Sequence, residues 1–402
     1  MLSRPLIPDP GEYDIDPDIG FVTPTPAELP EYYAPWHQLC SALPQLLKSK
    51  NLRIKIESLD ILTTDHLTSL SHWQRAYVIL GFLTQAYVWQ DKTSPSAAVP
   101  ASLGDPFIKV CEYLGMKPVL SYAGLCLWNW LPTRENNIWS PSETLSGFDN
   151  IKSTALFTGT RDEDAFYLVP VMVEAQGGKL VQLFLDAVTA DQKGNGGDLL
   201  STLQTCAARL KTMGETMSVL HQNCDPGFFY HRIRPMIAGS AGAEEKGLPN
   251  GVTLQCSNGS EVVVKCVGGS AGQSSLFQFL DHMFGVEHES KLLYEMRPYM
   301  PKNHREFLET VELLPSLRHI MERHPEDGRL RKAFQLVIEN FKQWRTRHVV
   351  VVSRYIVQPA AAEAKREEVN GQPNAEPKGT GGSLPIPFLK QYRDETVFSS
   401  EN

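Results

Sequence analysis

The sequence predicts an all-α protein of two helical domains that carries one small β-hairpin. Three observations lead to this prediction. Apolar residues recur every three or four positions along most of the chain, which is the period of amphipathic helices. β-prone residues gather in one interval only, residues 252–267. At 402 residues the chain can bury a large core that divides into domains. We place the small domain at residues 1–118 and the large domain at residues 119–402.

The small domain begins with a proline-punctuated arm over residues 1–28. Helical spacing of apolar residues follows over residues 29–47 and again over Ser71 to Trp89, where Ser71 is the expected N-cap. Both patterns have one apolar face and predict a pair of amphipathic helices. A Ser/Pro/Ala linker at residues 93–100 separates them from a short helix at residues 107–114.

The large domain repeats the helical pattern many times. Pro170 should kink or restart the first helix, and Gly177-Gly178 should interrupt it. The next apolar piece, residues 180–188, fits either a helix or a strand. The helical intervals predicted in this domain are 164–176, 199–221, 226–238, 276–284, 290–297, 304–313, 316–323 and 329–357.

The hairpin is predicted from two β-prone runs joined by a turn. Val252 to Cys256 and Glu261 to Val267 flank Ser257-Asn258-Gly259-Ser260, whose Asn-Gly pair is a hairpin signal. The second run leads into a Gly-rich segment, residues 268–275. Glycines at such a point allow the backbone to approach another group closely, and a flat ligand is one such group.

The last long helix places a histidine among apolar residues. Phe341, Trp344, His348, Val351 and Tyr355 share one face, so His348 should point inward. A buried imidazole must be hydrogen-bonded, neutral or bound to a metal, and this pattern leaves those alternatives open. The opposite face carries the cations expected to meet water: Lys342, Arg345, Arg347 and Arg354.

Two features bound the C-terminal part. Gln358-Pro359 should end the long helix. Residues 360–377 are poor in apolar side chains and predict a solvated, disordered segment, so we expect flexibility over residues 360–382.

Composition excludes several function classes. A net charge of −8 disfavours a nucleic-acid partner, which would need a basic surface. The longest uncharged apolar run, residues 166–173, is too short to cross a bilayer. Seven scattered cysteines without a C-x-x-C pair argue against a zinc knuckle and a disulfide framework. We therefore expect a cytoplasmic protein without a membrane or nucleic-acid partner.

One motif suggests a different enzyme class. Gly268 to Gly272 matches the G-x-S-x-G nucleophile elbow, and Ser270, Asp281 and His348 follow in the chain order of a serine hydrolase. That elbow sits on a sheet of alternating strands and helices, which this chain lacks. The hydrolase alternative is therefore remote. An inward histidine, a Gly-rich segment and many aromatic residues instead favour a planar cofactor with His348 as its axial ligand.

Several motifs in order resemble the indoleamine 2,3-dioxygenase family of haem enzymes. The resemblance covers nearly the whole chain. The blocks that carry it are Glu12 to Asp16, Ile19-Gly20-Phe21, Leu29 to Tyr33 with Trp36, Asp65-His66-Leu67, Ala86 to Trp89, Gly268 to Ser275, Met296 to Pro301 with His304-Arg305, His348 with Tyr355-Ile356, and Lys378 to Gly382.

The resemblance implies a small helical domain over a large one that holds haem b, with L-tryptophan cleaved by O2 at the indole C2–C3 bond to give N-formylkynurenine. It implies further that an electron donor keeps the haem ferrous and that the chain is a monomer. A haem protein with weak tryptophan turnover that acts as a sensor is the alternative. The serine hydrolase using Ser270 remains the remote one.

Matching the family's motifs assigns roles to individual residues. His348 is the implied proximal iron ligand, Arg234 rather than Arg232 pairs with the substrate carboxylate, and Phe229 and Phe166 enclose the indole. The remaining implied site residues are Tyr122, Leu125 and Cys126 in the deep wall, Gly269, Ser270 and Ala271 beside the haem, and Thr380 in a closing loop.

Three expectations qualify the match. Pro170 stands where many members have a serine, and Leu125 replaces a thiol found in some, so affinity and stereoselectivity for tryptophan are in question. Asp281 or another carboxylate should accept a hydrogen bond from the second ring nitrogen of His348.

Overall fold

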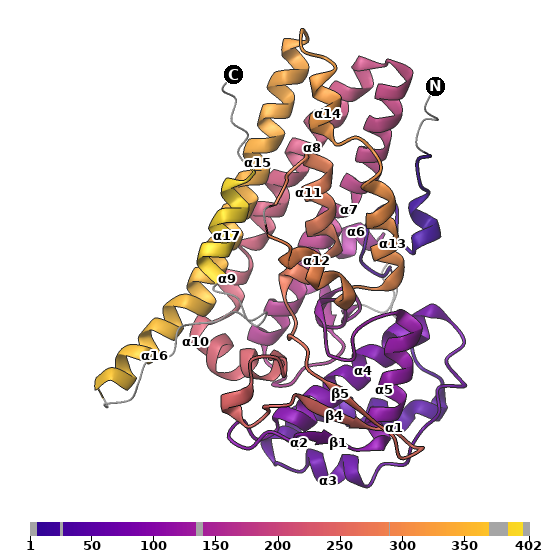
Figure 1. Ribbon diagram of the computed structural model, residues 1–402, viewed down its shortest axis with the longest axis vertical. Helices are drawn as coiled ribbons and strands as arrows, with labels where there is room; N and C mark the ends of the chain where they lie inside the picture. The colour runs from indigo at the N-terminus through magenta and orange to yellow at the C-terminus, as the bar shows by residue number, and fades with distance from the viewer. Residues whose placement is uncertain (1–5, 25–26, 134–139, 289, 370–384, 397–402) are drawn as a thin grey trace.

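The computed structural model describes residues 6–24, 27–133, 140–288, 290–369 and 385–396. Helices dominate, as predicted, and they form two groups (Figure 1). Short helices and a small sheet gather at one end of the molecule, and long helices run side by side at the other. The cavity described below is lined by residues from both halves of the chain.

The N-terminal helical region is more broken than its periodicity predicts. The interval 29–47 forms a 3-10 turn and separate helices rather than one helix. Leu70–Trp89 forms α4, capped by Ser69 instead of Ser71, and every residue from Gln74 to Trp89 is buried. α4 is therefore a central core helix rather than an amphipathic one. The other helices here are α1 (Ala34–Ser41), α2 (Leu43–Lys48), α3 (Leu52–Glu57) and α5 (Ala101–Leu114).

The predicted hairpin is present, and two further pairings were missed. β4 (Val252–Gln255) and β5 (Glu261–Val264) are antiparallel, with Val252 opposite Val264. β1 (Ala98–Val99), inside the expected linker, adds to β4 in parallel. A second antiparallel pair joins β2 (Trp130–Pro132) to β3 (Ile151–Ser153). The hairpin thus joins the first half of the chain, and the domain boundary at residue 118 stays a prediction.

The helix α7 (Arg161–Lys193) corrects the expected break at Gly177-Gly178. It runs unbroken through Pro170 and both glycines, so residues 180–188 are helical. The two glycines allow other segments to pack closely against α7. A Cβ on Gly178 would lie 2.2 Å from the carbonyl carbon of Ile19, and a Cβ on Gly177 would lie 2.4 Å from the Leu276 side chain. The N-terminal arm therefore passes directly over the backbone of α7.

α7 is also long and apolar enough to span a bilayer by length and composition. However, 72% of its most apolar window is buried inside the protein. A core helix of a soluble protein passes the same test, so this helix gives little support for a membrane segment.

A hydrophobic core lies between the long helices. α7 and α15 both pack along α8, and Phe184, Leu203, Phe279 and Phe341 are among the side chains fully buried between the helices. The helices not yet given are α6 (Pro141–Thr144), α8 (Gly196–Met217), α9 (Leu220–Asn223), α10 (Pro226–Phe228), α11 (Ser275–Phe284), α12 (Leu292–Met296), α13 (Lys302–Val311), α14 (Leu317–Glu322), α15 (Gly328–Val352), α16 (Gln358–Val369) and α17 (Pro385–Asp394).

The C-terminal end of α15 departs from two expectations. The chain does not stop at Gln358-Pro359, because a π-helical turn leads directly into α16. Residues 360–369 are therefore helical rather than disordered, while residues 370–382 of the expected flexible segment lie outside the described residues. Arg345, expected on the wet face, is 3% exposed and pairs with Asp281.

Candidate functional site

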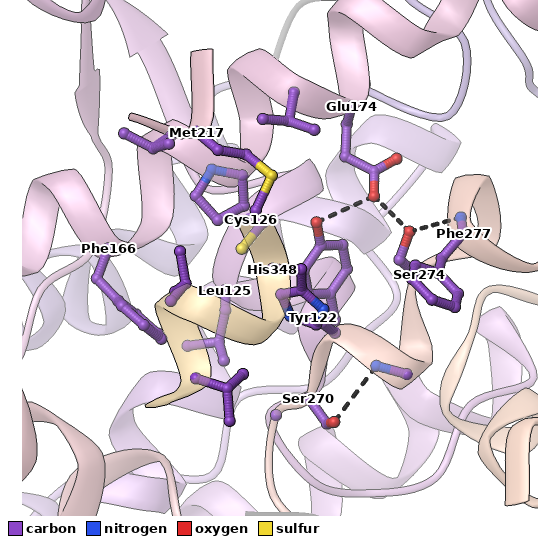
Figure 2. Close-up of a pocket in the computed structure, with 18 of the residues that line it drawn as sticks. Tyr122, Leu125, Cys126, Phe166, Glu174, Met217, Ser270, Ser274, Phe277 and His348 are labelled. Carbon is purple, nitrogen blue, oxygen red and sulfur yellow. Dashed lines mark hydrogen bonds between the residues drawn. The ribbon is translucent and has the colours of Figure 1, made fainter. Parts of the chain in front are cut away.

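A single cavity collects most of the residues that the sequence singled out (Figure 2). Its volume of about 260 Å³ is more than ten times the roughly 10–15 Å³ that one water needs. The cavity can therefore hold a large ligand. The predicted residues that line it are Tyr122, Leu125, Cys126, Phe166, Phe229, Gly269, Ser270, Ala271 and His348.

The rest of the lining is mostly apolar. Its residues lie on α7, α8, α9, α11, α12, α15 and α17 and on the segments between helices, so no single stretch of sequence defines the cavity. Such a lining binds a hydrophobic ligand and excludes water from it. The lining residues that the sequence did not single out for the site include Val173, Glu174, Met217, Phe277, Trp344 and Leu389.

Three π-helical turns deliver residues to the cavity. They are Ala123–Leu127, Phe229–Ile233 and Ser353–Val357. The first contributes Leu125 and Cys126, and the second contributes Phe229. A π-turn widens the helix by one residue and is found often at functional sites. Sequence periodicity at 3.6 residues per turn gives no sign of it.

His348 lies on α15 with its ring facing the cavity. The ring meets that of Phe277 edge-on, with centroids 6.4 Å apart. In the part of the chain that the structure describes, neither ring nitrogen has a hydrogen-bond partner. Burial, with the nearby charge of Arg345, lowers the pKa of His348 to about 4. The imidazole is therefore neutral at pH 7, with a lone pair available to a metal.

Asp281 does not serve His348 as we expected. Its two oxygens are taken by Arg345 and by Nε2 of His288, the latter at 2.9 Å. Asp281 therefore supports α15 one turn before His348 rather than orienting the histidine ring itself.

Phe166 and Phe229 form one aromatic wall. Their rings stack directly on each other, with centroids 4.1 Å apart and an interplanar angle of 30°. Tyr355 meets Phe229 edge-on at 5.9 Å. Because the two phenyl rings are in contact, they do not form two sides of a slot in this structure.

The Gly-rich segment packs against protein atoms. A Cβ on Gly268 would lie 2.1 Å from the carbonyl oxygen of Ile237, and one on Gly269 would lie 2.2 Å from Leu125. Ser270 Oγ accepts a hydrogen bond from the amide of Gly272 at 3.3 Å and so caps the 3-10 turn Ala271–Gln273. No hydrogen bond between described residues joins Ser270 to a histidine, which removes the support for a serine hydrolase.

Among the described residues that line the cavity, Glu174 is the acidic one, and it was not predicted from the sequence. Its Oε1 accepts hydrogen bonds from Tyr122 Oη at 3.0 Å and from Ser274 Oγ at 2.5 Å. Its Oε2 is buried without a partner. Burial raises the pKa of Glu174 to about 7, although both hydrogen bonds lower it. Its position could have been predicted from the helical period, because Glu174 lies eight residues after the predicted site residue Phe166 and on the same helix face.

Arg234 and Thr380 are not placed in the cavity. Arg234 is not among the lining residues; its guanidinium lies over the ring of Tyr230, 5.1 Å from the centroid. It is half-buried, whereas Arg232 is exposed, which fits the expectation that Arg234 is the inward arginine. Its role as carboxylate partner stays a prediction. Thr380 lies outside the described residues.

The chain is similar to known proteins over nearly its full length. Residues 9–399 match the family model described as indoleamine 2,3-dioxygenase. The chain belongs to the indoleamine 2,3-dioxygenase family. It is 34% identical to a 6-hydroxytryptophan 2,3-dioxygenase of Fusarium equiseti, covering 96% of both chains. It is 33% identical to an indoleamine 2,3-dioxygenase of Saccharomyces cerevisiae, with 99% and 95% covered, and 31% identical to the human indoleamine 2,3-dioxygenase 2, with 96% and 94% covered.

Membership confirms the predicted enzyme class. Indoleamine 2,3-dioxygenases are oxidoreductases that insert O2 into tryptophan-like indoles, and the family is haem-dependent. The cavity residues fit a haem: a neutral histidine nitrogen without a partner faces a large apolar space. A histidine nitrogen is a common ligand of haem iron, and an apolar surrounding suits the porphyrin.

Proposed function

We propose that this dioxygenase cleaves the indole C2–C3 bond of L-tryptophan with O2, giving N-formylkynurenine, and that His348 holds haem b as the proximal ligand. The observation that carries the proposal is the imidazole of His348, neutral and without a hydrogen-bond partner, at an apolar cavity. An uncharged imidazole nitrogen at the wall of such a cavity is the kind of group that haem iron takes as a ligand.

The chain's own residues would contribute positioning and water exclusion. When bound, the haem supplies the iron that activates O2 for addition to the indole ring. The wall of Phe166, Phe229 and Tyr355 gives a flat indole an aromatic surface to stack on. The lining keeps water away from the reacting ring. Arg234 would pair with the amino-acid carboxylate through two N–H donors.

Two cavity residues on α7 bear on how a substrate would be held. Glu174 accepts hydrogen bonds from Tyr122 and Ser274 through Oε1, and its Oε2 has no partner among the described residues. Pro170 lines the cavity and has neither a hydroxyl nor an N–H. We therefore expect no side chain of α7 at that position to bind the indole N–H.

The substrate could also be a ring-hydroxylated tryptophan, because one relative at 34% identity is named a 6-hydroxytryptophan 2,3-dioxygenase. We propose L-tryptophan, and the two are separated by comparing kcat/KM for each with the ferrous protein. We also propose a cytoplasmic location, which suits seven cysteines that are all free.

The test is a spectrum and a turnover assay on the purified protein. We expect a Soret band, and formation of N-formylkynurenine from L-tryptophan by the ferrous protein. His348→Ala should lose the band at equal protein concentration and keep its far-ultraviolet circular dichroism. A variant that kept both band and activity would refute the assignment. A haem-loaded wild type with negligible product would favour the sensor alternative.

A further inference from the structure

A cluster of buried ionisable side chains lies on the side of α15 that carries Arg345. Its members are Asp281 on α11, His288 just after α11, Arg345 on α15 and Glu395 just after α17. Their side chains are 7%, 11%, 3% and 16% exposed, respectively. Segments far apart in the sequence therefore meet through ionisable groups that water barely reaches.

His288 is the centre of this cluster because it binds a carboxylate on each side. Its Nε2 lies 2.9 Å from Asp281 Oδ2, and its Nδ1 lies 2.6 Å from Glu395 Oε2. Gln391 donates a hydrogen bond to the other oxygen of Glu395 at 2.9 Å. Glu395 is thus aimed at His288 by its own helix.

Arg345 joins the same segment from the other side. It pairs with the second oxygen of Asp281 and donates hydrogen bonds to the carbonyl of Tyr392 and to Thr396 Oγ1, the latter at 2.6 Å. Arg345 on α15 and His288 after α11 therefore both contact the C-terminal end of α17.

α17 also covers the cavity. Figure 1 shows it, in yellow, lying along α15. Leu389, in the middle of α17, lines the cavity, and Tyr392 one turn later is 1% exposed and stacks on His288 at 4.0 Å. The cluster holds the C-terminal end of the helix, and Leu389 faces the cavity from its middle.

The contacts of this cluster depend on one another. Buried charges are tolerated when every one is paired, and removing one partner leaves the others uncompensated. If Glu395 moved away, His288 would lose its contact at Nδ1, and Arg345 would lose Tyr392 and Thr396 as α17 followed. The cluster should therefore be formed or lost as a unit.

We propose that the bridge from Glu395 through His288 to Asp281 is a clasp that holds α17 against α15, so that Glu395 and His288 are positioning residues that retain the haem. The proposal rests on the proposed function for the haem at His348. Haem leaves past Leu389 when the clasp opens, and the clasp keeps that path closed.

The test measures haem loss from the holoenzyme to excess apomyoglobin, followed at the Soret band. Glu395→Gln and His288→Gln keep the size of each side chain and remove its charge or its second contact. We expect each to release haem at least tenfold faster than the wild type. The double variant should release it no faster than the faster single variant, because both act on one contact. Asp394→Asn is the matched control, since Asp394 is the preceding residue and is exposed.

Trypsin provides a readout that does not need haem. α17 contains Lys390, so its release appears as faster cleavage after this residue, located by mass spectrometry. Cleavage after Arg393 is not used, because Arg393 pairs with Asp394 and both substitutions lie next to that bond. Faster cleavage in Glu395→Gln and wild-type cleavage in Asp394→Asn support the clasp. Equal cleavage in the two variants overturns it. Faster cleavage with haem release at the wild-type rate overturns the exit past α17. A wild type that takes up no haem refutes the proposed function, and the cleavage result still decides whether the clasp exists.

Discussion

Replacing Glu174 with glutamine should make the protein more stable above pH 7 and leave it little changed below pH 5. Glu174 is 3% exposed, and burial raises its pKa from 4.5 to about 7. At about 1.4 kcal/mol per pKa unit, holding this carboxylate ionised in the folded protein costs about 3 kcal/mol. Glutamine keeps an oxygen for Tyr122 and Ser274 and carries no charge.

The sign follows from proton binding. Between pH 4.5 and 7 the folded protein binds more protons at Glu174 than the unfolded chain does, so its stability falls as pH rises through this window. Above pH 7 the loss is complete. The stability advantage of Glu174→Gln should therefore grow from pH 5 to pH 7.5 and approach about 3 kcal/mol.

Urea unfolding of both proteins at several pH values, in the same state of haem loading, measures this difference. Glu163→Gln is the matched contrast on the same helix. Glu163 is fully buried, but it accepts hydrogen bonds from the amides of Phe157 and Thr158, from Thr158 Oγ1 and from Tyr167 Oη. Glutamine there turns an N–H toward a donor, so Glu163→Gln should destabilise. If the advantage of Glu174→Gln were independent of pH, the carboxylate would not be the buried, partly unpaired group described here.

Three further outcomes are expected. Gly178→Ala should destabilise by at least about 2 kcal/mol in thermal unfolding, because its Cβ would lie 2.2 Å from the backbone of Ile19; an unchanged midpoint would mean that the arm moves freely. Pro170→Ser should stabilise by up to about 3 kcal/mol in urea unfolding, because serine restores an N–H inside α7, and no gain would mean that the helix had already adjusted. Arg234→Ala should raise KM for L-tryptophan roughly ten- to hundredfold, because a hydrogen bond to a charged group contributes about 1.5–3 kcal/mol. Arg232→Ala should leave KM unchanged. The reverse result would exchange the roles of the two arginines.

The sequence by itself determined the helical class, the hairpin at residues 252–267 and the apolar stripe that carries His348. These features depend on short-range physics. Helix periodicity and an Asn-Gly turn act between residues a few positions apart, so both can be recognised from the sequence. The family resemblance, carried by blocks in order along the chain, extended this to the enzyme class.

Only the tertiary structure decided which residues meet across long separations. Gly177-Gly178 predicts a helix break when only local sequence is considered. In the structure α7 continues through both glycines, and the backbone of Ile19 packs against Gly178. Arg345 looks like a surface cation until Asp281 and the end of α17 surround it. The π-helical turns that bring Leu125, Phe229 and Tyr355 to the cavity interrupt the 3.6-residue period on which the sequence prediction relies. Burial, which sets the protonation of Glu174 and His348, is a property of the whole fold, so it could not be computed from either residue's neighbours in sequence.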